Sequence, residues 1–282
     1  MRKDICVLIA LMAYSANAQV ISGSIVIFNF TKDKSVVAAD SLAGNEDTGI
    51  PDYSDCKIAA FGQHLIFTTV GNSGWSDRLG NVPAWDNIAL ARDAFQTVHA
   101  SGGGSDLNAI AAQWASDVKS HWDFIDRMDR QRARSIAASN DGQFTAGMFI
   151  GKGLSSKVVI IGYDFDKPID PIEILTGDRK AMSNCWSCGQ LQESMICGAG
   201  KHLDVAANYC AKRQHGERID VHTELNSATE STKLAVKIVE MTIDSYGQTA
   251  KDVGGKVDAV TIMKDGSITW NARKANCPDN QN

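Results

Sequence analysis

Residues 22–44 read SGSIVIFNFTKDKSVVAADSLAG, and this stretch decides the fold expected of the 282-residue chain. GSIVIFNF alternates and is rich in β-branched residues, which predicts a strand, and KSVVAAD after the turn TKDK is its expected hairpin partner. Asp40 ends that second apolar run, where a carboxylate is either a turn residue or the partner of a positive group. Lys57 is the candidate partner, because it opens the next expected strand and antiparallel neighbours would bring the two strand ends together. A half-buried Asp–Lys pair without catalytic duty is the alternative.

The rest of the chain predicts further strands and helices in alternating blocks. KIAAFGQHLIFTTVG predicts two short strands bent at Gly62, and apolar residues at helical spacing predict helices over 88–98 and 107–118, the second capped by Asp106. Strands are expected at FTAGMFIG, KVVIIGYDF and PIEILTG, helices at GKHLDVAANYCAK and STKLAVKIVEMTIDSYG, and a closing hairpin from KVDAVTIM to SITW. This order predicts an α+β fold in which helices cover the outer faces of two stacked sheets, within a single domain over 24–282.

The first eighteen residues have the features of a signal peptide. MRK is a basic start, ICVLIALMAY an apolar run too short to span a bilayer permanently, and ANA before Gln19 fits the small-residue cleavage rule. The sequence therefore predicts export to the periplasm or the medium, with no membrane attachment after cleavage. A net charge of −5 with scattered Lys and Arg provides no basic footprint for nucleic acid.

Six cysteines follow the predicted signal peptide, and in an oxidising compartment an even number favours structural disulfides, in any of fifteen pairings. The motif CWSC also admits a redox dithiol or half of a zinc site. Its surroundings do not resemble a thioredoxin-like unit, and the nearby Cys and His spacing matches no common zinc finger. The disulfide interpretation is favoured for the six residues Cys56, Cys185, Cys188, Cys197, Cys210 and Cys277.

Ser24 adds a chemical reason for the acid at Asp40. A serine becomes a good nucleophile when a base lies beside it, and the α-amine of an N-terminal serine can be that base. A lysine ammonium then stabilises the developing alkoxide, and an aspartate orients the lysine. Ser24, Lys57 and Asp40 fit these roles if the Gly23–Ser24 bond is cleaved. Residues 19–23 would form a short propeptide, and Gly23 offers little steric hindrance to attack by Ser24.

The stretches SIVIFNFTKDKSVVAADS, KI and LIFTTVGNSG resemble the N-terminal half of proteasome β-type subunits and their bacterial relatives, which are N-terminal-nucleophile hydrolases. The spacing from Ser24 to Asp40 and that from Lys57 to Gly71 match the family without a gap. The resemblance continues more thinly through VVIIGYDFDKP, CGAGKHLDVAANY and AKDVGGKVDAVTI. It implies a four-layer αββα sandwich of two stacked antiparallel sheets. It also implies that Gly71 donates its backbone amide to the oxyanion of the tetrahedral intermediate.

The resemblance implies an amide-bond hydrolase that requires no cofactor or metal and forms a homo-oligomeric ring. Because the signal peptide predicts export to a compartment without ATP, the expected substrates are peptides or unfolded chains. Three departures concern activity: the nucleophile is Ser rather than Thr, Ala199 replaces a supporting Ser, and Val253 follows Asp252 where a companion Ser is expected. Two alternatives therefore stay open. One is a catalytically silent assembly or binding protein, and the other is an amidase for small N-acyl compounds.

Overall fold

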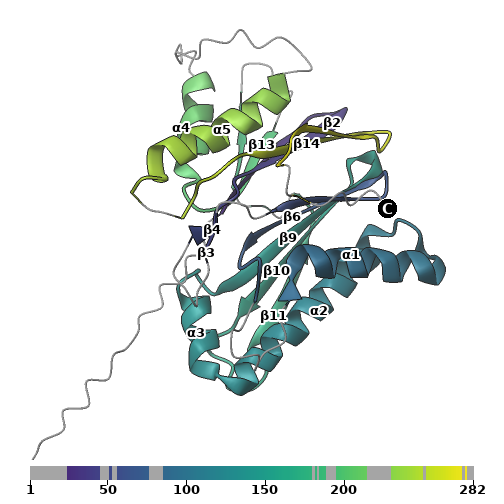
Figure 1. Ribbon diagram of the computed structural model, residues 1–282, viewed down its shortest axis with the longest axis vertical. Coiled ribbons are helices and arrows are strands. Elements are labelled where there is room, and N and C mark those ends of the chain that lie inside the picture. Colours follow the sequence, from purple (N-terminus) through teal and green to yellow (C-terminus); the bar gives the residue numbers. More distant parts are fainter. Residues whose placement is uncertain are drawn as a thin grey trace, which may run out of the picture.

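The computed structural model describes residues 24–44, 51–52, 56–75, 85–179, 182, 184–188, 195–214, 230–249, 252–274 and 277. The predicted signal peptide and propeptide lie outside these residues. In the described part of the chain, two antiparallel sheets contain most of the strands (Figure 1). The first has the order β12 (Cys185–Ser187), β13 (Met195–Gly200), β1 (Ile25–Phe30), β2 (Lys34–Ala39), β14 (Asp258–Met263) and β15 (Ile268–Ala272). The second has the order β11 (Ile172–Gly177), β10 (Ser156–Tyr163), β9 (Gln143–Gly151), β6 (Leu65–Gly71) and β5 (Ile58–Phe61).

Helices cover the outer face of each sheet (Figure 1). The first sheet packs against α4 (Asp204–Gln214) and α5 (Glu230–Tyr246), and the second against α1 (Asn87–Val98), α2 (Leu107–Met128) and α3 (Arg130–Ala138). Two short pairs, β3 (Ala43–Gly44) with β4 (Pro51–Asp52) and β7 (Gly74–Trp75) with β8 (Trp85–Asp86), lie outside these sheets. The α1–α2 connection contains a helical segment over His99–Gly103 and the residues up to Asp106, which caps α2 as expected.

Three apolar clusters separate the four layers, and the strand β1 shows why. Ile25 and Ile27 pack toward α4 and α5, whereas Val26 and Phe28 point into the space between the sheets. Alternating side chains of a strand point to opposite faces, so a strand buried on both faces must be apolar throughout. The third cluster joins the second sheet to its helices through a group of aromatic side chains, Phe67, Trp114, Trp122, Phe144 and Phe149. The four-layer αββα sandwich is therefore confirmed.

Most predicted elements are present, and the differences have local causes. The second predicted helix extends to Met128, and α3 follows it without having been predicted, because its residues are mostly polar. The segment MICGAG is the strand β13, which was not predicted, and the helix expected from Gly200 begins at Asp204.

Candidate active site

Asp40 and Lys57 form a buried ion pair between the two sheets. The Lys57 Nζ lies 2.8 Å from Asp40 Oδ1, and the two side chains are 1% and 0% exposed. The predicted contact is present, but the predicted route to it is wrong. The strands β2 and β5, at whose ends the two residues lie, belong to different sheets and are not hydrogen-bonded neighbours. Stacking of the sheets brings their ends together.

Backbone amides complete the surroundings of the Asp40 carboxylate. Oδ1 accepts a hydrogen bond from the Ile25 amide at 3.0 Å, and Oδ2 accepts one from the Gly254 amide at 3.0 Å. The Lys57 ammonium also donates to the Leu42 carbonyl. A buried charge is tolerated when it is paired and hydrogen-bonded. These contacts compensate both charges and fix the lysine in position.

Ser24 lies directly before the Ile25 amide that binds Asp40, at the start of β1. Its side chain is 4% exposed, and its carbonyl accepts a hydrogen bond from the Lys201 amide at 2.9 Å. Gly200 has a φ of +100°, and a Cβ there would overlap the Ser24 carbonyl oxygen. Only glycine fits such a backbone approach at this φ. The last residue of β13 and the residue after it thus fix the backbone of Ser24.

Gly71 ends β6, with its amide directed away from β9. Asn72 donates to the Phe144 carbonyl, so Gly71 and Thr145 form a non-hydrogen-bonded pair of the β6–β9 ladder. The amide of Thr69, two residues earlier, binds the Lys57 carbonyl. Amides two residues apart on a strand point to the same side. The Gly71 amide therefore points toward the side of β6 on which Lys57 lies, as an oxyanion donor requires.

Ser24 and Gly71 both line a cavity of about 340 Å³. Half-buried apolar residues from both sheets and from the segment before β12 form one part of its wall: Val70, Ala146, Val158, Ile160, Met182 and Ala199. Polar residues form another part: Ser139, Asn140, Asp141, Gln143, Asn184 and Lys201. The four predicted site residues are thus placed around one region, with Ser24 and Gly71 at the cavity and Asp40 and Lys57 in the adjoining core.

One histidine close to these residues, His202, was not identified from the sequence. Asp252, expected to support the nucleophile, lies 2.7 Å from His202 Nε2, and the His202 ring stacks on Tyr246 with centroids 3.9 Å apart. His202 has a φ of +58°, a left-handed conformation that non-glycine residues rarely adopt. Ala199 has no hydroxyl to offer Asp252. No sequence pattern pointed to His202, because its partner is 50 residues away.

The disulfide interpretation of the cysteines is confirmed by three pairs: Cys56–Cys277, Cys185–Cys197 and Cys188–Cys210. The two cysteines of CWSC bond to residues elsewhere rather than to each other. Within the described residues, no group of three His, Cys, Asp or Glu side chains is placed to hold a metal ion, and no helix is long and apolar enough to cross a membrane.

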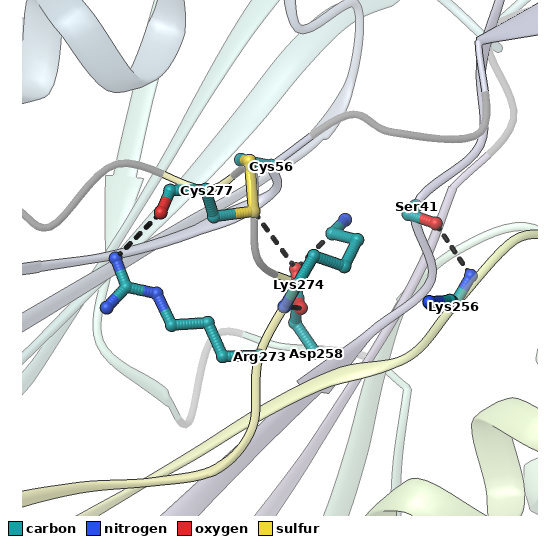
Figure 2. Close-up of a disulfide and its surroundings, with 7 residues drawn as sticks. All are labelled: Ser41, Cys56, Lys256, Asp258, Arg273, Lys274 and Cys277. Carbon is teal, nitrogen blue, oxygen red and sulfur yellow. Dashed lines mark hydrogen bonds and ion pairs between the residues drawn. A yellow bond between two sulfur atoms is a disulfide. The ribbon is translucent and has the colours of Figure 1, made fainter.

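Figure 2 shows the Cys56–Cys277 disulfide and its surroundings. Cys56 directly precedes Lys57 in the sequence, so the disulfide adjoins the site. The segment after β15 is further held by Lys274, whose Nζ lies 2.9 Å from the buried Asp258 carboxylate. Arg273 donates to the Cys277 carbonyl at 3.1 Å. The disulfide attaches the start of β5 to Cys277, and the other two contacts hold the segment after β15 in place.

Among the comparisons with known proteins, matches were found to solved structures. No protein family and no curated protein matches the sequence. Among solved structures, the chain is similar to "Anbu (Gly-1) mutant" from Hyphomicrobium sp. strain MC1, with 15% sequence identity, a TM-score of 0.45, and coverage of 88% of this chain and 85% of that one. The fold described above therefore rests on the strand order, the layers and the apolar clusters of this chain itself.

Proposed function

We propose that this chain is an N-terminal-nucleophile hydrolase that cleaves amide bonds of peptides or unfolded proteins. The observation that carries the proposal is the buried Asp40–Lys57 pair, whose carboxylate also binds the amide next to Ser24. A purely structural ion pair would not require a serine beside it, or a Gly71 amide that points to the side of β6 on which Lys57 lies. The combination matches the needs of a serine nucleophile.

The reaction would proceed through an acyl-enzyme. Ser24 Oγ attacks the substrate carbonyl while the Ser24 α-amine takes the hydroxyl proton, and the Lys57 ammonium favours the developing negative charge on Oγ. The oxyanion accepts a hydrogen bond from the Gly71 amide. The α-amine returns its proton to the leaving nitrogen as the C–N bond breaks. Water then hydrolyses the Ser24 ester and releases the acid.

Activity requires the Gly23–Ser24 bond to be cleaved, since only then is the α-amine free. We propose that Ser24 Oγ attacks the Gly23 carbonyl, that the acyl group moves from nitrogen to oxygen, and that water hydrolyses the resulting ester. Signal-peptide cleavage after residue 18 and export would precede this step. The three disulfides support an oxidising compartment for the domain over 24–282. We further propose that α1 and α2 contribute to contacts in a homo-oligomeric ring.

The silent assembly or binding protein is a second candidate. The observation that favours it is Ala199, which leaves Asp252 paired with His202 in place of a supporting hydroxyl. An amidase acting on small N-acyl compounds is a variant of the first proposal. A volume of 340 Å³ falls within the range typical of small-molecule pockets.

The test is the intact mass and N-terminal sequence of the exported protein, followed by labelling with a serine-reactive peptide electrophile. We expect the wild type to begin at Ser24 and to be labelled there, and Ser24→Ala to retain QVISG and stay unlabelled. Ser139→Ala is the matched control, because Ser139 lines the same cavity. A wild type that begins at Gln19 and is not labelled would refute the hydrolase and favour the silent protein.

A further inference from the structure

Thr145 holds the peptide bond that presents the Gly71 amide. Its hydroxyl donates a hydrogen bond to the Val70 carbonyl at 3.0 Å, and its side chain is 1% exposed. In a trans peptide the carbonyl and the following N–H point in opposite directions. A hydroxyl that fixes the Val70 carbonyl on the β9 side therefore also fixes the Gly71 N–H on the opposite side. By the same alternation Val70 and Ala146 form a hydrogen-bonded pair of the ladder, so the Thr145 hydroxyl is a second donor to a carbonyl that already faces β9.

Asn87, the first residue of α1, holds the Thr145 hydroxyl in turn. Its side chain is fully buried, and its Nδ2 donates to Thr145 Oγ1 at 2.9 Å and to the Asn72 carbonyl at 2.8 Å. An oxygen that accepts from Asn87 keeps its own hydrogen for the Val70 carbonyl at 3.0 Å or for Thr69 Oγ1 at 3.2 Å, and the Val70 carbonyl is the nearer acceptor. Aligned hydrogen bonds also polarise one another. Asn87 thus favours Thr145 as a donor, with the Val70 carbonyl as its nearer acceptor.

Further contacts keep Asn87 from moving. Its backbone amide donates to the Ser73 carbonyl at 2.8 Å, and its carbonyl accepts from the Trp114 indole at 3.1 Å. The loop after Gly71 is therefore attached to the start of α1, and α1 to the middle of α2. Gly71 itself has a φ of +82°, and a Cβ there would lie 2.8 Å from the Phe144 carbonyl oxygen. The amide has little freedom to rotate.

We infer that Thr145 and Asn87 are positioning residues, which hold and polarise the Val70–Gly71 peptide so that its N–H stabilises the oxyanion. The inference rests on the proposed function of Ser24. The buried hydroxyl in β9 is the group that connects the Asn87 amide to the Val70 carbonyl. The reaction would lose rate without Thr145, whereas binding of the substrate before attack would change little.

The experiment compares Thr145→Val with Thr145→Ser, which keeps the hydroxyl. The comparison variant is Thr69→Val, which makes the same change in the same cluster, at a buried threonine whose hydroxyl contacts Thr145 Oγ1 and Asn87 Nδ2, each at 3.2 Å. Two quantities are measured on the mature protein: the rate of Ser24 acylation at saturating peptide electrophile, and the amide resonance of Gly71 in protein labelled with ¹⁵N-glycine. Circular dichroism selects variants that are folded.

We expect Thr145→Val to slow acylation by about tenfold to a hundredfold at unchanged half-saturation, somewhat less than deletion of an oxyanion donor. The Gly71 resonance should shift, and Thr145→Ser should restore both quantities. Thr69→Val should produce smaller changes. An unchanged acylation rate in folded Thr145→Val would overturn the inference, as would failure of the serine to restore it.

The two proposals fail in different ways. If the wild-type protein is never acylated at Ser24, the proposed hydrolase is refuted and the Gly71 resonance alone decides the positioning. A resonance that does not move in Thr145→Val overturns the positioning as well. A resonance that moves and is restored by serine supports it as a property of the fold.

Discussion

Removing the Cys56–Cys277 disulfide should cost more stability than removing either of the other two. It joins residues separated by 221 positions, whereas the other two pairs are separated by 12 and 22. The chain-entropy relation gives about 5 kcal/mol for the long loop and about 3 kcal/mol for each short loop. The expected difference of about 2 kcal/mol arises in the unfolded chain, which gains far more freedom when the long loop opens.

The assay is urea unfolding of three double Cys→Ser variants beside the wild type, with the free energy extrapolated to zero denaturant. We expect the variant lacking Cys56 and Cys277 to have the lowest stability of the three. Cleavage of a chromogenic peptide is followed in parallel, because Cys56 adjoins Lys57. Equal losses in the three variants, or the largest loss from Cys185 with Cys197, would refute the loop-length reasoning.

Three further variants test the site and its surroundings. Lys57→Met should abolish cleavage before Ser24 and destabilise the fold by about 3–5 kcal/mol, because Asp40 is left as an unpaired buried charge. Mass spectrometry measures the cleavage and urea unfolding measures the stability. Processing at the normal rate would contradict the role of the lysine. Gly200→Ala should slow processing at least tenfold, because the methyl group displaces Ser24; an unaltered rate would exclude this packing constraint. Burial lowers the pKa of His121. The folded state then favours the neutral imidazole of His121. The stability that this preference contributes is lost as the pH falls below about 6.5. His121→Gln should therefore flatten the decline of unfolding free energy between pH 7 and 5, and an unchanged slope would contradict that origin.

The sequence predicts the parts of the fold that depend on residues close together in the chain. The β1–β2 hairpin, the bend at Gly62 and the cap at Asp106 follow from alternation, glycine and capping preferences, and all are present. The strand β13 was not predicted, because MICGAG contains two glycines and is stabilised by pairing with β1 and β12. Its strand character comes from partners far along the chain.

The site shows the same division. Ser24, Asp40, Lys57 and Gly71 can be identified as candidates from their spacing in the sequence. The contact of Asp40 with Lys57 arises from stacking of the two sheets, which the pattern of a single strand does not indicate. The pair of Asp252 with His202 and the bond from Thr145 to Val70 join residues 50 and 75 positions apart. Such contacts depend on how the layers pack and need the three-dimensional structure.

The strand order of the first sheet has a consequence for the timing of folding. The central strands β1 and β2 are made first, yet their outer neighbours, β13 and β14, come from the last third of the chain. Contacts between distant segments form late, because a long loop must close before they are gained. Ser24 therefore cannot be held against Gly200 until β13 has been made, nor Asp40 against Gly254 until the residues just before β14 have been made. The proposed nucleophile would stay harmless to the nascent chain and its surroundings until both of these later segments exist.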